Sequence, residues 1–193
     1  MRGTMRAMRA EAFGGYQDLK LTDIPSPALS DEHVLVRMTA AGVTPLDHTI
    51  LFGQYPNAKA PLVLGNEGAG IVEGGGTVEY PTGSRVMFTG PYGVLENGTL
   101  SELVAVQREH LCLVTDNVED AAAAGLPVAY LTAFLTLKAA GFQAGKSSSL
   151  RQSAARWATP PFSWPERSEP STRFRRPPVT QSRNRPKNGA FQR

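Results

Sequence analysis

The chain has 193 residues, and 41% of them are hydrophobic, which is enough to bury the core of one domain or of one domain plus a fragment. Its single cysteine, Cys112, excludes an internal disulfide framework and a zinc site built on several cysteines, and no run of about eighteen apolar residues is present that could span a membrane. We therefore expect a protein of a reducing compartment, the cytoplasm, with no membrane partner.

The charge is distributed unevenly along the chain. Residues 1–146 carry 10 Lys and Arg against 15 Asp and Glu, and residues 147–193 carry 10 against 2. The formal net charges of the two parts are −5 and +8, so the basic character of the whole chain comes from residues 147–193. The two parts therefore need separate explanations.

Up to residue 117 the pattern predicts short strands and turns. The opening stretch MRGTMRAMRAEAF lacks the apolar core of a signal peptide, which indicates an uncertain start site, and we assign it no function. Strands are predicted where apolar or β-branched residues alternate between glycines, in residues 33–43, 61–73, 83–88 and 98–106. This spacing is typical of a β-barrel or a β-sandwich. Cys112, between two leucines, is expected to be a small buried apolar residue.

Helices are predicted in two places. In residues 44–53, Thr44 is a possible N-cap and Pro45 would take the first helical position. Residues 118–141 form the stronger pattern, in which Lys138 is the only charge of the stretch PVAYLTAFLTLKAAG. Large apolar residues lie around most of the circumference of this helix, so it needs cover on every side; they are Leu131, Phe134, Leu135 and Leu137.

The glycines of GNEGAG, which are Gly65, Gly68 and Gly70, are similar on paper to a phosphate-binding loop. However, an apolar strand follows them, and no helix start is available to hold a pyrophosphate. We therefore interpret them as tight backbone turns and close approaches between strands.

Five stretches occur in an order and spacing typical of one family: VLVRMTAAGVTPLDH, PLVLGNEGAGIVE, GSRV, GTLSELVAV and AAAAGLPVAYLTAFLTL. From about Met8 to Lys146 the chain therefore resembles the medium-chain dehydrogenase/reductase superfamily, and most of all its zinc-free quinone oxidoreductase branch, which includes zeta-crystallin. The resemblance implies a GroES-like, partly open β-barrel in residues 1–117 and a connecting helical segment in residues 118–146. In complete members it implies a Rossmann domain that binds NADPH.

The resemblance also identifies the positions that decide between zinc and zinc-free chemistry. Zinc-dependent relatives have a cysteine in the stretch matching GVTPLDH and a histidine before the glutamate of GNE, where this chain has Thr44 or its neighbours and Asn66. Neither residue supplies the thiolate or imidazole ligand, so we expect no zinc. The remaining candidate donors do not form a ligand pair at a metal-binding spacing; they are His33, Asp47, His48, Glu67 and His110.

In this branch the chemistry resembles direct hydride transfer from NADPH to a quinone or an activated alkene, and few catalytic side chains are expected. By motif matching, Thr44 and Thr132 are the candidate cofactor-binding residues and Tyr55 is the candidate substrate-binding residue, with no catalytic residue assigned. Thr44 stands where the family usually has an asparagine near the nicotinamide ribose, and its hydroxyl lacks the reach of an amide. Structural alternatives exist for all three: a helix cap for Thr44, packing against the barrel for Tyr55, and a hydroxyl bonded back to a helix carbonyl for Thr132.

Two explanations stay open for residues 147–193, which have no repeat and contain seven prolines. The first is a basic arm that binds polyanions, with Phe162, Trp164 and Phe174 available for stacking on bases. The second is a shifted reading frame, because starting each codon one base earlier permits the translation VVLAPVGGSVGNATFQLARALGA. That pattern of strand, glycine-rich turn and helix is the nucleotide-binding opening of a Rossmann unit. We favour this second explanation and expect residues 147–193 to be a disordered, frameshifted tail.

The sequence thus predicts the N-terminal catalytic-domain portion of a zinc-independent, NADP-dependent quinone or enone oxidoreductase, inactive as this chain. The alternatives are a non-catalytic, stand-alone β module whose basic tail binds polyanions, and a zinc alcohol dehydrogenase, which the absent ligands disfavour. In complete relatives the expected partners are NADP(H) and a small quinone or enone substrate, with no specific nucleic acid. The resemblance also implies a homodimer in those relatives, which we do not carry over to this chain.

Overall fold

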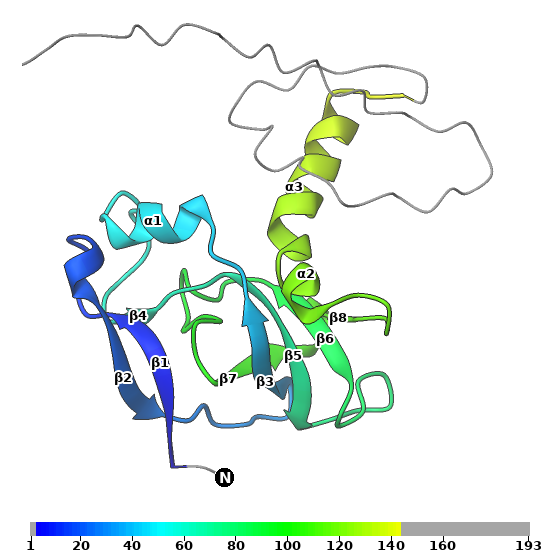
Figure 1. Cartoon of the computed structure of the whole chain (residues 1–193), viewed down its shortest axis with the longest axis horizontal. Helices are drawn as coiled ribbons and strands as arrows, with labels where there is room; N and C mark the ends of the chain where they lie inside the picture. The colour runs from blue at the N-terminus through cyan, green and yellow to red at the C-terminus, as the bar shows by residue number, and fades with distance from the viewer. Residues whose placement is uncertain (1–2, 144–193) are drawn as a thin grey trace, which may run out of the picture.

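A computed structural model describes residues 3–143, which form two antiparallel sheets, one short helix between their strands and two helices after them (Figure 1). The smaller sheet has the strand order β2-β1-β4, and its strands are Leu19–Pro25, Thr4–Ala10 and Leu62–Val63. The larger sheet has the order β7-β3-β5-β6-β8, and its strands are Leu103–Gln107, His33–Ala41, Glu67–Gly74, Arg85–Thr89 and Leu111–Leu113. This mainly β arrangement confirms the predicted fold class. The predictions for residues 147–193 lie outside the described residues.

The two sheets are joined into a partly open barrel by the residues that precede β7. The amide of Met8 in β1 donates to the carbonyl of Leu100 at 2.8 Å, and the amide of Glu102 donates to the carbonyl of Arg6 at 3.1 Å. Farther along, β7 pairs with β3 from His33↔Gln107 to Arg37↔Leu103. One continuous stretch of chain therefore pairs first with the smaller sheet and then with the larger one.

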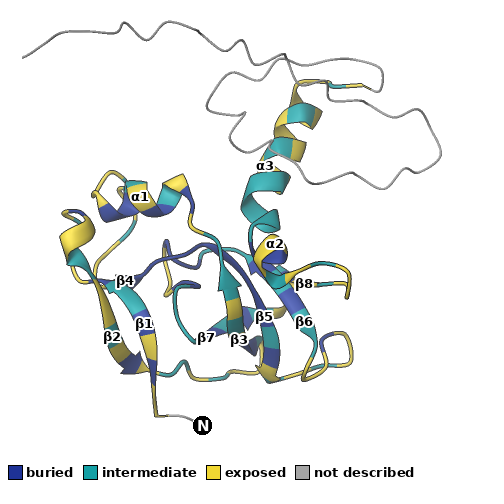
Figure 2. Cartoon of the chain, viewed as in Figure 1, coloured by how far each residue is buried: buried dark blue, intermediate teal, exposed yellow. Residues whose placement is uncertain are grey.

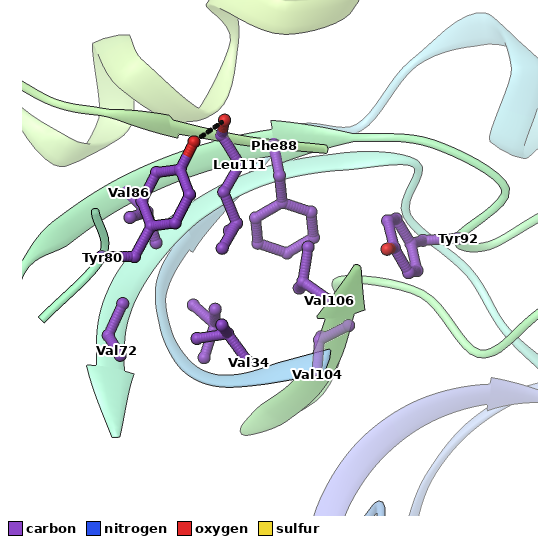
Figure 3. Packing of buried hydrophobic residues seen from close by; sticks show 10 residues of the cluster. Val34, Val72, Tyr80, Val86, Phe88, Tyr92, Val104, Val106 and Leu111 are labelled. Atoms are coloured by element: carbon purple, nitrogen blue, oxygen red, sulfur yellow. Dashed lines mark hydrogen bonds between the residues drawn. The ribbon is translucent and has the colours of Figure 1, made fainter. Parts of the chain in front are cut away.

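The main core lies on the inner face of the larger sheet and is built from valines and aromatic residues (Figures 2 and 3). Strand alternation brings these residues together from strands that are distant in the sequence, and they include Val34, Val36, Val72, Val86, Phe88, Val104 and Val106. Two buried tyrosines keep their hydroxyls bonded, as buried polar groups must. The hydroxyl of Tyr80 donates to the carbonyl of Leu111 at 3.0 Å, and that of Tyr92 accepts from the amide of Gln107 at 2.9 Å.

The opening residues form a hairpin that the sequence analysis did not predict. β1 and β2 pair without interruption from Thr4↔Pro25 to Ala10↔Leu19. In β1 the buried positions Met5 and Ala7 alternate with exposed ones. Small alanines and interspersed arginines make this alternation weak in a hydropathy pattern, and pairing with β2 supplies the missing stabilisation.

The short helix α1, Pro45–Leu51, confirms the helix predicted in residues 44–53. Thr44 is its N-cap with an extended backbone (φ −115°, ψ 162°), and Pro45 occupies the first position, as predicted. The helix buries Ile50 and Leu51 against β1 and β4. The helix ends at Leu51 with Phe52 as its C-cap, and the next residue, Gly53, has a positive φ of 68° that suits a glycine.

The single helix predicted for residues 118–141 is wrong, because the chain forms two helices there. They are α2, Asp120–Ala124, and α3, Leu126–Ala139, with Gly125 between them. Pro127 explains the break, since its ring would clash with a carbonyl of the preceding turn, whereas it is tolerated in the first turn of a new helix. A short 3₁₀ turn at Tyr16–Asp18 and another at Arg108–His110 complete the described elements.

Helix α3 extends away from the sheets, and none of its residues is buried (Figures 1 and 2). Leu131, Phe134 and Leu135 are each about half exposed, which leaves the apolar circumference of this helix largely uncovered. Within residues 3–143 no helix has the length and apolar character needed to cross a membrane.

The prediction that Cys112 is buried is wrong. Cys112 is exposed, whereas its neighbour Leu111 is buried in the main core. Successive side chains of a strand point to opposite faces of the sheet. In the edge strand β8, therefore, only one of these two neighbouring residues can face the core.

The structure confirms that the glycines of GNEGAG serve turns and close strand approaches. Gly65 has a φ of 96°, and Gly68 and Gly70 lie in β5 between β3 and β6. A methyl group at Gly70 would collide with the carbonyl oxygen of Arg37 and lie 2.6 Å from a methyl of Val36.

Gly70→Ala should therefore lower the free energy of unfolding by about 1–3 kcal/mol, because the backbone of β3 cannot move away without breaking its pairing. The matched control is Gly74→Ala in the same strand, where the nearest atom would lie at an ordinary 3.6 Å and the change should be neutral or slightly stabilising. Urea unfolding followed by circular dichroism measures both. Equal stability of the two variants would contradict this account of β5.

Candidate functional site

Five polar residues are buried among the described residues, and they gather where β3 ends and β5 begins. They are Thr44, Asp47, Asn66, Glu67 and Thr99, hereafter the buried polar cluster. Burying polar groups is unfavourable unless their hydrogen bonds are replaced. The bonds that each member makes therefore define what this region can do.

Asp47 holds the start of α1 against the turn that precedes β5. One carboxylate oxygen accepts the amide of Thr44 at 2.7 Å and its hydroxyl at 2.9 Å, and the other accepts the amide of Gly65 at 2.8 Å. The next residue, His48, is exposed and stacks on Phe52, with ring centroids 4.3 Å apart. The three bonds to Asp47 replace the water that its burial removes.

The beginning of β5 is held from two further directions. The Thr89 hydroxyl donates to the carbonyl of Asn66 at 2.7 Å, and the Thr99 hydroxyl donates to the carbonyl of Glu67 at 2.8 Å. The Thr44 hydroxyl also lies 3.3 Å from the side-chain oxygen of Asn66. The buried polar cluster thus links α1, the start of β5 and the segment before β7, and Thr89 of β6 bonds to it.

Glu67 connects the barrel to α3. Glu67 is buried, with only 3% of its surface exposed. Its carboxylate accepts the amide of Val128, the third residue of α3, at 2.8 Å. Removal from water raises the pKa of Glu67; the hydrogen bond from Val128 opposes this rise, and the nearby Asp47 carboxylate adds to it. An acidic side chain at the positive end of a helix dipole is favourable, so Glu67 acts as a tertiary cap.

A second charged residue anchors α2. The guanidinium of Arg85 in β6 donates to the carboxylate of Asp120 through Nε at 3.1 Å and also bonds to the carbonyls of Thr115 and Val118. The hydrogen bond from Arg85 lowers the pKa of Asp120. The neighbouring strands β5 and β6 therefore each hold one helix: β5 holds the first turn of α3, and β6 holds the first turn of α2.

The three predicted site residues lie on three different segments. Thr44 is buried at the start of α1 and bonds within the buried polar cluster. Tyr55 follows α1 and packs half buried against the cluster formed by α1, β1 and β4, in agreement with its structural alternative. Thr132 is exposed in the middle of α3, where the hydroxyl of Thr136 donates back to its carbonyl at 2.7 Å.

The donor groups at the buried polar cluster do not suit zinc. Thr44 and Asn66 offer a hydroxyl and an amide, and the carboxylate of Glu67 is engaged by Val128. Across residues 3–143 no three His, Cys, Asp or Glu side chains are grouped so that they could hold a metal ion. Zinc in proteins is bound mainly by thiolate, imidazole and carboxylate ligands, of which only a carboxylate is present at the cluster.

A groove of about 390 Å³ lies between β1 and the end of β3, and it is lined by Arg6, Met38, Leu100 and Glu102 among others. Thr44, Tyr55 and Thr132 do not line it. The three predicted residues therefore lie outside this groove.

The comparisons with known proteins agree with this architecture. Residues 30–116 match the alcohol dehydrogenase GroES-like domain. The class of protein is thus one that contains a GroES-like β domain. The chain belongs to the medium-chain dehydrogenase/reductase superfamily, of which it contains the N-terminal portion.

Three relatives carry this assignment. The NADPH-dependent alkenal/one oxidoreductase of Arabidopsis thaliana chloroplasts is 34% identical over 152 residues, which cover 74% of this chain and 39% of that protein. The quinone oxidoreductase of Pongo abelii is 29% identical over 148 residues, covering 74% and 44%. The structure of the quinone oxidoreductase from Coxiella burnetii has a TM-score of 0.69 at 26% identity, covering 74% of this chain and 47% of that one. The chain spans less than half the length of each.

Sequence reasoning considered Glu67 only as a possible metal ligand and missed its contact with α3. A signal was present, because α3 has no side chain at its N-cap Gly125 and no acidic residue in its first turn. A helix that lacks local caps requires a partner from elsewhere in the fold.

The raised pKa of Glu67 predicts a measurable pH dependence. The folded chain binds this proton more tightly than the unfolded chain, so the corresponding stability is present at low pH and is lost as the pH rises through the folded-state pKa. Glu67→Gln cannot ionise. The difference between the two free energies of unfolding, that of the variant minus that of the parent, should therefore increase with pH. The increase should run from pH values below about 4.3, the ordinary glutamate pKa, to neutral pH.

Urea unfolding at a series of pH values measures this difference. Glu73→Gln is the matched control, since Glu73 lies in the same strand but is about half exposed beside Arg37, and it should not reproduce the increase. A difference for Glu67→Gln that stays constant or decreases with pH would count against a desolvated carboxyl at this position.

Asp47→Ala should lower the free energy of unfolding by about 3 kcal/mol, because it leaves the buried amides of Thr44 and Gly65 without an acceptor. Asp23→Ala, at an exposed position of β2, should change it by less than about 0.5 kcal/mol. Thermal and urea denaturation of both variants provide the test. A small effect of Asp47→Ala would mean that water replaces its bonds.

Proposed function

We propose that this chain is the catalytic-domain portion of a zinc-independent, NADPH-dependent oxidoreductase that transfers hydride to a quinone or an activated alkene. The observation that carries the proposal is the similarity to quinone and alkenal/one oxidoreductases over 74% of the chain, with α3 leaving the barrel from the same buried polar cluster that contains Thr44. A cytoplasmic location and a small-molecule substrate accompany this proposal.

In this proposal the residues of the chain form one wall of the reaction site. Thr44 offers its hydroxyl oxygen as an acceptor to the cofactor ribose, because its proton is already donated within the buried polar cluster. Tyr55, with its ring held against the α1 cluster, donates its hydroxyl to the developing oxyanion of the substrate. Thr132, exposed on α3, would contact the nicotinamide part of the bound cofactor. NADPH, when bound, supplies the hydride.

The opposite wall requires a nucleotide-binding unit. All strand pairs between the strands of residues 3–143 are antiparallel, whereas a pyrophosphate site needs a parallel strand, a glycine turn and a helix start. We propose that the codons after Lys146, translated in the shifted frame, encode this unit. The chain with residues 147–193 as given should then neither bind NADPH nor turn over.

The decisive comparison expresses the 193-residue chain beside a version with the frame restored after Lys146. Quinone-dependent NADPH oxidation should occur only in the restored version. There Tyr55→Phe should lower kcat/KM about tenfold, equal to about 1.4 kcal/mol, while Tyr16→Phe, at an exposed turn, should not. Turnover or micromolar NADPH binding by the 193-residue chain would contradict the proposal.

Zinc independence has its own test. Elemental analysis of the purified chain should find well under one zinc per molecule, because a thiolate and an imidazole are missing from the cluster. A chelator should leave the melting temperature unchanged. Stoichiometric zinc, or a chelator-dependent loss of stability, would require a different donor set.

A further inference from the structure

We infer that Glu67 is a positioning residue that holds α3, and with it Thr132, in a fixed direction relative to Thr44. The inference rests on the proposed function only in treating α3 as one wall of the cofactor cleft. The positioning itself follows from contacts of the described residues.

Helix α3 has few means of fixing its own start. Its N-cap is Gly125, its first turn has no acidic residue, and none of its residues is buried. The first amides of a helix have no partner within it, and Pro127 has no amide to offer. Val128 has a free amide, and this amide donates to the carboxylate of Glu67, 61 residues earlier in the chain.

Glu67, by contrast, is fixed on every side. Its carbonyl accepts the amide of Gly42 at 3.0 Å and the hydroxyl of Thr99 at 2.8 Å, and its backbone pairs with Thr89 in β6. The carboxylate lies directly over Gly42, where a methyl group would collide with Oε1 and lie 2.5 Å from Cγ. A glycine at position 42 is therefore a condition for the carboxylate to reach Val128.

The pivot of α3 lies at Gly125. On one side of it α2 is anchored through Asp120 to Arg85, and on the other side α3 is bonded through Val128 to Glu67. Gly125 has no side chain to resist a change of backbone direction. Without the carboxylate, α3 should swing about this residue while the barrel and α2 stay in place.

A distance measurement tests this swing in the whole 193-residue chain. Cys112, exposed on β8 and the only cysteine, takes one spin label, and Lys138→Cys, at an exposed position of α3, takes the second. Double electron–electron resonance of this parent should give a single narrow distance peak. Glu67→Ala should lose that peak, whereas the matched control Glu73→Ala in the same strand should retain it.

Gly42→Ala provides a second route, because it displaces the carboxylate without removing it, with Gly74→Ala as its control. Gly42→Ala should also lose the narrow distance peak. If Glu67→Ala does not fold, the measurement on Gly42→Ala decides whether Glu67 positions α3. A merely structural role for Glu67 would lower the unfolding midpoint and leave the peak intact. Retention of the parent's peak by a folded variant of either kind overturns the inference. No cofactor is present in this measurement, so its outcome is independent of NADPH oxidation.

Discussion

The arrangement depends on the burial of two carboxylates, Asp47 and Glu67, beside the first residues of one strand. Each is at most 4% exposed, and the Asp47 carboxylate contributes to raising the pKa of Glu67. Such a pair is tolerated only because amides and hydroxyls replace the lost water. Those donors come from α1, from the turn before β5 and from α3, so satisfying the two charges fixes the relative positions of all three.

The barrel thereby acts as a frame for helices that cannot fix themselves. α1 is a short helix whose first turn depends on Asp47, and α3 carries no buried residue. Isolated helices of this length are marginal in water, so tertiary anchors decide where they point. Leu131, Phe134 and Leu135 of α3 are about half exposed, so packing of apolar residues does not fix this helix within residues 3–143.

Several features were predictable because they follow from local chemistry. Thr44 and Pro45 form an N-cap and a first helical position whatever surrounds them, and the glycines at 65, 68 and 70 permit a turn and close strand approach. The hairpin of β1 and β2 was missed because its stability comes from pairing rather than from its own hydropathy. Cys112 was predicted to be buried because it lies between two leucines. In a strand, however, neighbouring side chains face opposite sides of the sheet, so the burial of Leu111 leaves Cys112 exposed.

The sequence by itself determined the β class, the position of α1, the role of the glycines and the resemblance to the oxidoreductase family. These depend on residue types, on their period and on motif order along the chain. Only the tertiary structure decided that Glu67 reaches Val128 and that Arg85 holds Asp120. The physical reason is distance along the chain: partners 61 and 35 residues apart leave no periodic trace, and their contact exists only once the strands have paired.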